Sequence, residues 1–244
     1  MEETALISVS DSLLKIARKV SPIETIYDCG SRDAQDGLYL LESLQAKELH
    51  IFECNPASVE KCRQNVRRYV GKGAIFVNDM AVSDSKGTLP FFAIDTGTTI
   101  TSHPDGNPGA SSLYRANPGY KKERYVQREM TVTSTTLDEY ALTHAEPDLL
   151  WMDLQGAELS ALQGAAGILS KVRLIHTEIA FRPVYLGQPL FWTIDAFLKR
   201  GFDLVHLNVG RWPKIPWLYK LSGKGPWFGD AIYVNRSIRK PNWS

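Results

Sequence analysis

Acidic and basic side chains lie at the ends of two apolar segments in the second half of the chain. Residues 148–153, DLLWMD, form an apolar strand that ends on Asp153, and the next apolar segment carries His176 and Glu178. Residues two apart on a strand share a face, and open α/β sheets bind ligands at the carboxyl ends of their strands. A carboxylate or an imidazole there can accept a proton from a hydroxyl group. We therefore predict Asp153, His176 and Glu178 as catalytic residues, with a core histidine as the alternative role for His176.

A second set of polar residues lies in the first quarter of the chain. In residues 26–37, IYDCGSRDAQDG, an apolar strand runs into Asp28 and Gly30, so the backbone can approach a ligand where the next helix begins. The following strand, in HIFECNP, ends on Glu53, whose carboxylate can accept hydrogen bonds from both hydroxyls of a ribose. Together these features predict an adenosine-binding site. The alternative is an ordinary turn and an exposed strand end.

The charge of this turn distinguishes between two cofactors that contain adenosine. The pyrophosphate of NAD needs several close glycines and an electropositive helix start. This turn lacks G-x-G-x-x-G and carries Asp28, Asp33 and Asp36, which would repel phosphate but suit the ammonium and sulfonium groups of S-adenosylmethionine. Arg32 or the amides of the turn could bind its carboxylate, while Met80 could pack on the adenine ring or simply in the core. We predict S-adenosylmethionine as the cofactor, bound by residues that follow three successive strands: Asp28, Gly30, Ser31, Arg32, Asp33, Glu53, Cys54, Asn55, Asp79, Met80 and Ala81.

The elements that must position these residues alternate between apolar strands and amphipathic helices. Strands are expected over residues 24–29, 49–52, 74–77, 148–153, 174–180, 204–207 and 231–234. Helices are expected over residues 36–45, 56–70, 159–169 and 190–199. Two further strands, 87–94 and 130–134, are expected to pair at an edge. This βαβα order predicts a Rossmann-like α/β fold with a mostly parallel sheet, flanking helices and an added strand pair.

Length and composition predict a single globular domain. The chain has 244 residues, of which 43% are hydrophobic and 23% charged, as in average globular proteins. An amphipathic helix with apolar positions from Leu13 to Val20 precedes the first strand. We expect residues 1–22 to form an N-terminal helix packed on the domain, residues 23–236 to form the domain itself, and residues 237–244 to form a C-terminal tail.

Charge and cysteine content limit the partners of the protein. Lys plus Arg is 28 against 27 for Asp plus Glu, so no global field favours nucleic acid, and no apolar run is long enough to span a membrane. The first residues are acidic where a signal peptide is basic. Cys29, Cys54 and Cys62 show neither metal-ligand spacing nor a disulfide framework. We predict a cytoplasmic enzyme with reduced thiols, no metal and no nucleic-acid partner.

Two long irregular segments interrupt the alternation, and loops of this length are usually functional. Residues 95–128 are rich in turn-forming residues and are expected to close over the site. Residues 210–228 interleave aromatic and basic side chains and could stack on sugars, hold a phosphate-bearing carrier, make a peripheral membrane contact, pack against a second subunit or simply be buried. For Glu158, capping of the following helix is an equal alternative to substrate contact. The residues expected to contact the acceptor are Ser111, Ser112, Tyr114, Glu158 and Tyr185.

Seven sequence blocks, taken in order, resemble the FkbM-family methyltransferases. They are DCGSRD, IFECNP, DGNPGASSLYR, TTLDEY, WMDLQGAELSALQGA, IHTEIAF and GDAIYVN, and they extend over roughly residues 26–234. The resemblance implies the seven-stranded class I methyltransferase fold, with Asp28, Gly30 and Glu53 at the cofactor and Asp153 at the end of the fourth strand. This chain departs from a common family pattern in its DCGSRDAQDG turn, and it has Gln155 where many members have Glu.

These observations lead to one leading function and two alternatives. The resemblance implies O-methylation, so the expected reaction is transfer of a methyl group to a hydroxyl of a saccharide or related natural product, and the expected partner is a small-molecule or glycan acceptor. A nicotinamide-dependent oxidoreductase on a similar fold is disfavoured by the acidic turn. A non-catalytic binding or scaffold protein is disfavoured by the predicted acid and base residues.

Overall fold

Seven strands form the main sheet of the computed structural model, which describes residues 9–209 and 226–238. The strand order is β3-β2-β1-β7-β8-β10-β9, and β10 is antiparallel to both of its neighbours, whereas the other pairs are parallel. The mostly parallel sheet predicted from the sequence is therefore confirmed. The strands are β1 (Thr25–Cys29), β2 (Glu48–Glu53), β3 (Ala74–Asp79), β7 (Leu149–Met152), β8 (Leu174–Ala180), β9 (Phe202–Asn208) and β10 (Phe228–Asn235).

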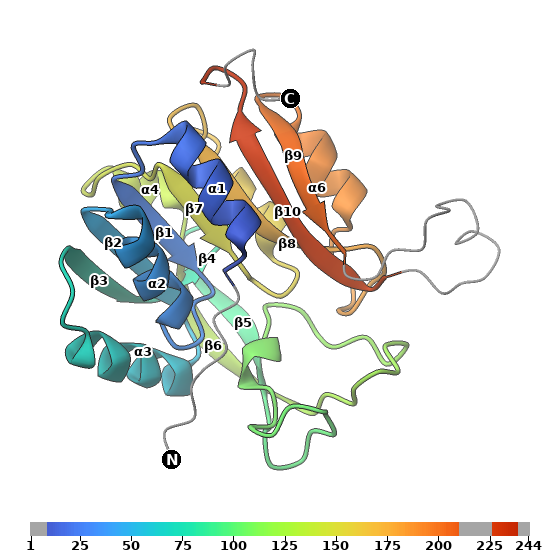
Figure 1. The fold of residues 1–244 in the computed structure, drawn as a ribbon. Helices are drawn as coiled ribbons and strands as arrows, with labels where there is room; N and C mark the ends of the chain where they lie inside the picture. Colours follow the sequence, from blue (N-terminus) through green and yellow to red (C-terminus); the bar gives the residue numbers. More distant parts are fainter. Residues whose placement is uncertain (1–8, 210–225, 239–244) are drawn as a thin grey trace.

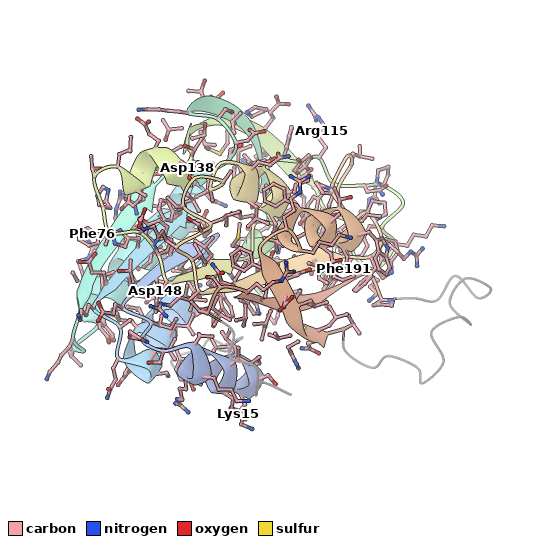
Figure 2. All side chains as sticks on the ribbon, turned by 90° about the horizontal axis from the view of Figure 1, so that it is seen from above. Lys15, Phe76, Arg115, Asp138, Asp148 and Phe191 are labelled. Atoms are coloured by element: carbon pink, nitrogen blue, oxygen red, sulfur yellow. The ribbon has the colours of Figure 1, made fainter. Side chains whose placement is uncertain are left out.

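Helices cover both faces of this sheet. One layer contains α1 (Asp11–Val20), α2 (Gln35–Leu44) and α3 (Pro56–Arg68), and the other contains α4 (Leu137–Ala141), α5 (Glu158–Gln163) and α6 (Phe191–Leu198). Buried apolar side chains pack between each helical layer and the sheet, so the fold has one apolar core on each side of the sheet. In Figure 2, Lys15 on α1 and Asp138 on α4 lie on opposite sides of the sheet, and Phe76 lies at its outer edge.

Local sequence explains where several helices begin. The Ser10 hydroxyl accepts a hydrogen bond from the Leu13 amide at the start of α1, and the Asn55 side chain accepts one from the Ala57 amide at the start of α3. The short helix α4 was not expected, because five residues are too few for a helical period, but Thr136 caps it in the same way. Helix α5 ends at Gln163, earlier than expected, and turns follow it.

The added strand pair forms a separate sheet rather than an edge of the main sheet. Strands β5 (Gly87–Ile94) and β6 (Gln127–Thr135) are antiparallel, as expected, but a short strand, β4 (Ala81–Val82), joins them to give the order β4-β6-β5. The chain leaves the main sheet immediately after β3, and for this reason the pair does not extend it. Residues 95–126 connect β5 to β6 and lie beyond the carboxyl ends of the main strands (Figure 1).

The topology brings two predicted site segments together. Strand β1 lies between β2 and β7, with Cys29 in register with Met152, although β7 follows much later in the chain. Gly30 and Asp153 therefore follow neighbouring strands at the point where the strand order reverses. Open α/β folds bind their ligands at such a point.

The ends of the chain bear on several predictions. Residues 1–8 of the expected N-terminal segment and residues 239–244 of the expected tail lie outside the described residues. Helix α1 buries Leu13, Leu14, Ala17 and Val20 against the core. Over residues 9–209 and 226–238, no helix is both long and apolar enough to cross a membrane. Cys29, Cys54 and Cys62 form no disulfide.

Candidate active site

A cavity opens at the carboxyl ends of the main strands and is closed on one side by the segment 95–126. It is lined by many of the residues predicted from the sequence, which are Gly30, Arg32, Glu53, Cys54, Asn55, Met80, Ala81, Ser111, Ser112, Asp153, Glu178 and Tyr185. The other predicted residues lie outside its lining, and these are Asp28, Ser31, Asp33, Asp79, Tyr114, Glu158 and His176.

Glu53 joins the turns that follow β1 and β2. Its Oε1 accepts hydrogen bonds from the amides of Cys54 and Asn55, both at 2.8 Å, and its Oε2 accepts one from the Arg32 amide at 2.9 Å. A carboxylate has about four lone-pair directions, so roughly one remains for a ligand. Burial raises the pKa of Glu53, and the three amides oppose that rise. Glu53 is therefore first an organiser of the two turns.

Gly30 is required by the backbone that surrounds it. Its φ of +84° lies in the left-handed region, and a Cβ atom there would lie 1.9 Å from the Asp153 carbonyl oxygen. The Gly30 amide also donates to the Phe52 carbonyl at 2.9 Å. The close approach expected from the sequence is thus an approach to the backbone that follows β7.

Asp28 is fully buried beneath the turn. Its Oδ2 accepts from the Ser31 hydroxyl at 2.5 Å, and its Oδ1 has no hydrogen-bond partner among the described residues. Burial raises the pKa of Asp28 to about 8, with the nearby Asp36 and Glu53 adding to the rise and Ser31 opposing it. Asp28 is therefore largely protonated at neutral pH and does not supply the charge that the sequence suggested.

The other charged residues of this region are paired. The Arg32 guanidinium forms an ion pair with Asp105 in the segment 95–126, although its buried Nε has no partner among the described residues. The Asp33 side chain accepts from the Gln35 amide at 3.1 Å. Asp79 lies 3.7 Å from Arg63 and is not among the residues that line the cavity.

Asp153, Gln155 and Glu178 form a polar cluster at the other end of the cavity. The Gln155 Nε2 donates to Asp153 Oδ1 at 2.5 Å and lies 3.3 Å from Glu178 Oε2. Burial raises the pKa of Asp153 to about 6, and burial together with the charge of Asp153 raises the pKa of Glu178 well above its ordinary value. Burial and the mutual repulsion of the two groups therefore favour a single negative charge on the pair over two. In the sequence, Gln155 stood out only as a departure from the Glu that many family members have there.

Glu158 and His176 lie behind the cavity. Glu158 Oε1 accepts from the Leu154 amide at 2.9 Å and the Gly156 amide at 3.2 Å, so it holds the turn that precedes α5. The His176 ring stacks on Trp151 with centroids 3.9 Å apart, and burial lowers the pKa of His176 to about 3. Although His176 and Glu178 share a face of β8, His176 is covered by its neighbour on β7. It is therefore not placed to act as the base.

A wall of aromatic rings faces the acidic cluster, and it includes Tyr185, a predicted acceptor contact, and Trp227 from the predicted segment 210–228. Tyr120 packs on Trp227 and Tyr125, with ring centroids 4.9 and 5.9 Å apart, and Tyr125 lies parallel to Tyr185 at 6.4 Å. Tyr120, Tyr125 and Tyr185 line the cavity, together with Glu123, which lies 3.6 Å from His103. We call Tyr120, Tyr125, Tyr185 and Trp227 the aromatic wall. Of the predicted segment 210–228, residues 210–225 lie outside the described residues.

The segment 95–126 is tied to the main domain at several points. The Ser112 hydroxyl donates to the Gln155 carbonyl at 2.7 Å, and the Ser111 hydroxyl accepts from the Asn55 amide group at 3.3 Å. The Tyr185 hydroxyl lies 2.8 Å from the Ala110 carbonyl. The segment thus covers the site, as predicted, but both serine hydroxyls are engaged in internal hydrogen bonds.

The burial of Asp28 predicts how stability depends on pH. Because its pKa is raised in the folded state, the native protein binds a proton that the unfolded chain has lost, so stability decreases as pH rises from about 4 to about 8. Asp28→Asn should remove up to about 1.4 kcal/mol per pH unit of this dependence. Urea unfolding at pH 5 and pH 8 measures it, with the exposed Glu146→Gln as control. The same pH dependence in Asp28→Asn and the parent protein would contradict the assignment.

Known proteins with a similar sequence or fold are methyltransferases. The model of the methyltransferase FkbM domain matches residues 28–204. The 2-O-methyltransferase NoeI of Sinorhizobium fredii is 27% identical over 214 residues, which cover 83% of this chain and 81% of NoeI. The crystal structure of the methyltransferase FkbM from Methylobacillus flagellatus KT matches with a TM-score of 0.51 and 16% identity.

The likeness to the Methylobacillus structure covers 87% of this chain but 43% of that chain, so the present chain spans less than half of its length. At this identity the likeness concerns the fold alone, and it confirms the class I methyltransferase fold. The family match extends over most of the chain. The chain therefore belongs to the FkbM family of methyltransferases, and this membership supports S-adenosylmethionine as its cofactor.

Proposed function

We propose that the protein transfers a methyl group from S-adenosylmethionine to a hydroxyl of a saccharide or related natural product. The observation that carries the proposal is the pair Asp153 and Glu178, which faces the aromatic wall across one cavity. Aromatic rings present apolar faces on which the faces of a sugar ring can stack, and carboxyl groups bind its hydroxyls. NoeI, a 2-O-methyltransferase, lends further support to an oxygen acceptor.

The residues at the opposite end of the cavity fit the cofactor. Glu53 retains about one lone-pair direction for a ribose hydroxyl, and the buried Arg32 Nε has no partner among the described residues, so it could bind a carboxylate. Apolar side chains at this end could pack on an adenine ring, and they include Phe52, Met80, Val82, Phe91 and Leu113. The cofactor would therefore be held between the turns after β1, β2 and β3.

The chain's own task in this reaction is to orient the acceptor and to take its proton. S-adenosylmethionine, when bound, supplies a methyl group that is already activated as a sulfonium. The ionised Asp153 accepts the hydroxyl proton, while the protonated Glu178 donates a hydrogen bond that holds the acceptor in place. The segment 95–126 excludes water from the cavity and supplies two rings of the aromatic wall. Positioning of this kind can account for much of the rate of a displacement reaction.

Cofactor choice is tested by titration calorimetry. S-adenosylhomocysteine should bind and NAD should not, because the turn after β1 lacks the close glycines that a pyrophosphate needs. Glu53→Gln should weaken the binding of S-adenosylhomocysteine by about 1–3 kcal/mol, because it removes charge-assisted hydrogen bonds. The exposed Glu60→Gln on α3 is the control. Tight binding of NAD, with no response to S-adenosylhomocysteine, would refute the proposed function.

The acid pair predicts both the pH dependence of turnover and an asymmetry between two substitutions. Because Asp153 must be ionised to accept a proton, turnover should rise as pH increases through about 6. Asp153→Asn should lower turnover by about 10²–10⁴-fold, the usual contribution of a general base. Glu178→Gln should cost about tenfold or less, because glutamine keeps the hydrogen-bond donor of the protonated acid.

These rates are measured with an acceptor found by screening neutral sugars, nucleotide sugars, glycolipids and polyketide hydroxyls with labelled S-adenosylmethionine. Cofactor is kept saturating, so that a loss of binding is not mistaken for a loss of catalysis. Near-normal turnover in Asp153→Asn would place the base elsewhere. A larger loss in Glu178→Gln than in Asp153→Asn would reverse the two roles.

A further inference from the structure

We propose that Gln155 is a positioning residue that orients the pair of Asp153 and Glu178 and determines which of the two is ionised. One amide nitrogen lies 2.5 Å from Asp153 Oδ1 and 3.3 Å from Glu178 Oε2, so its strong hydrogen bond goes to Asp153. Hydrogen bonding to the charged form of an acid favours that form. Gln155 therefore directs the negative charge to Asp153 and leaves the proton on Glu178.

The orientation of the Gln155 amide follows from the acceptors around it. The Tyr185 hydroxyl lies 2.8 Å from both Gln155 Oε1 and the Ala110 carbonyl oxygen, so its single hydrogen can go to either of them, and Tyr185 is almost completely buried. Because an ionised carboxylate can only accept a hydrogen bond, the Nε2 group of Gln155 must face the two carboxyl groups. A glutamate at position 155 would instead place a third acid against them, with no donor for either.

The backbone also holds Gln155 in place. Its φ is +51° and that of Gly156 is +104°, so two consecutive residues adopt left-handed conformations, which a non-glycine residue adopts at a cost of about 1–2 kcal/mol. The Ser112 hydroxyl donates to the Gln155 carbonyl and ties this turn to the segment that covers the cavity. Strained residues held by their surroundings occur most often at functional sites.

The charges around Asp153 show why a donor is needed. The groups that act on it are Glu178 on β8, Asp230 on β10, Asp36 on α2, Glu158 on α5, the Tyr185 hydroxyl and Arg32. All but Arg32 are acids, and Arg32 is already paired with Asp105. Without the amide of Gln155, the ionised form of Asp153 would lose its nearest donor among the described residues.

Two substitutions separate this role from a merely structural one. Gln155→Asn keeps an amide and tolerates a left-handed backbone, but it is one methylene too short to reach both carboxyl groups. Gln155→Glu keeps the length and replaces the donor by an acid. Both should raise the pKa of Asp153 by about one unit or more, because a hydrogen bond to a charged group contributes about 1.5–3 kcal/mol. The exposed Gln163→Glu on α5 adds the same charge elsewhere and should leave this pKa unchanged.

The pKa is measured on the full chain by carboxyl ¹³C NMR with labelled aspartate, where Asp153→Asn identifies the signal. Because Asp153 and Glu178 interact, the apparent pKa values belong to the pair and not to either residue. The whole Asp153 titration curve is therefore compared between the variants and the parent protein. Thermal unfolding of each variant establishes that it is folded. An Asp153 titration that is the same in the parent, Gln155→Asn and Gln155→Glu would overturn the inference.

The use of this pair in catalysis rests on the proposed function, but its titration does not. With an acceptor in hand, the rising limb of turnover against pH should move upward in Gln155→Asn by the same amount as the NMR titration. A shift in the NMR titration without methylation of any acceptor would support the role of Gln155 and count against the proposed function. Methylation of an acceptor together with an unshifted NMR titration would support the proposed function and count against the role of Gln155.

Discussion

Burial of carboxyl groups at the carboxyl edge of the main sheet is the constraint on which the rest of the site depends. Asp28, Asp153, Glu158 and Glu178 are withdrawn from water, and burial is the largest cause of the raised pKa of each. A buried charge without partners is very costly, so such groups either take up protons or gather donors. Here they do both. The result is a set of acids whose protonation changes near neutral pH, as sites of proton transfer require.

The turns around this edge are arranged to satisfy the acids. Glu53 collects three amides from two turns, Glu158 collects two from a third, and Gly30 lets the first turn lie against the backbone of Asp153. Each acid thereby fixes the shape of a loop. The same carboxyl groups that give the site its charge therefore also hold its turns in shape.

Much of this arrangement could be predicted from the sequence because parallel strands bring their carboxyl ends to one edge. Glu53, Asp153 and Glu178 were found in this way. The covering of His176 by Trp151 could not be, since it depends on the register between β7 and β8. The role of Gln155 depends on a left-handed backbone, and the aromatic wall combines rings from the segment 95–126, the loop after β8 and the residue that precedes β10. Neither follows a period of two or 3.6 residues, which is what sequence patterns report.

The connection between β5 and β6 has a consequence for how such enzymes diversify. These strands are neighbours in a small sheet of their own, so the segment 95–126 is an insertion at the tip of a hairpin. Its length and sequence can change without altering the register of the seven-stranded sheet. The segment supplies Tyr120, Glu123 and Tyr125 to the far end of the cavity. Exchange of this hairpin tip between relatives is thus a route by which one catalytic frame could acquire new acceptors.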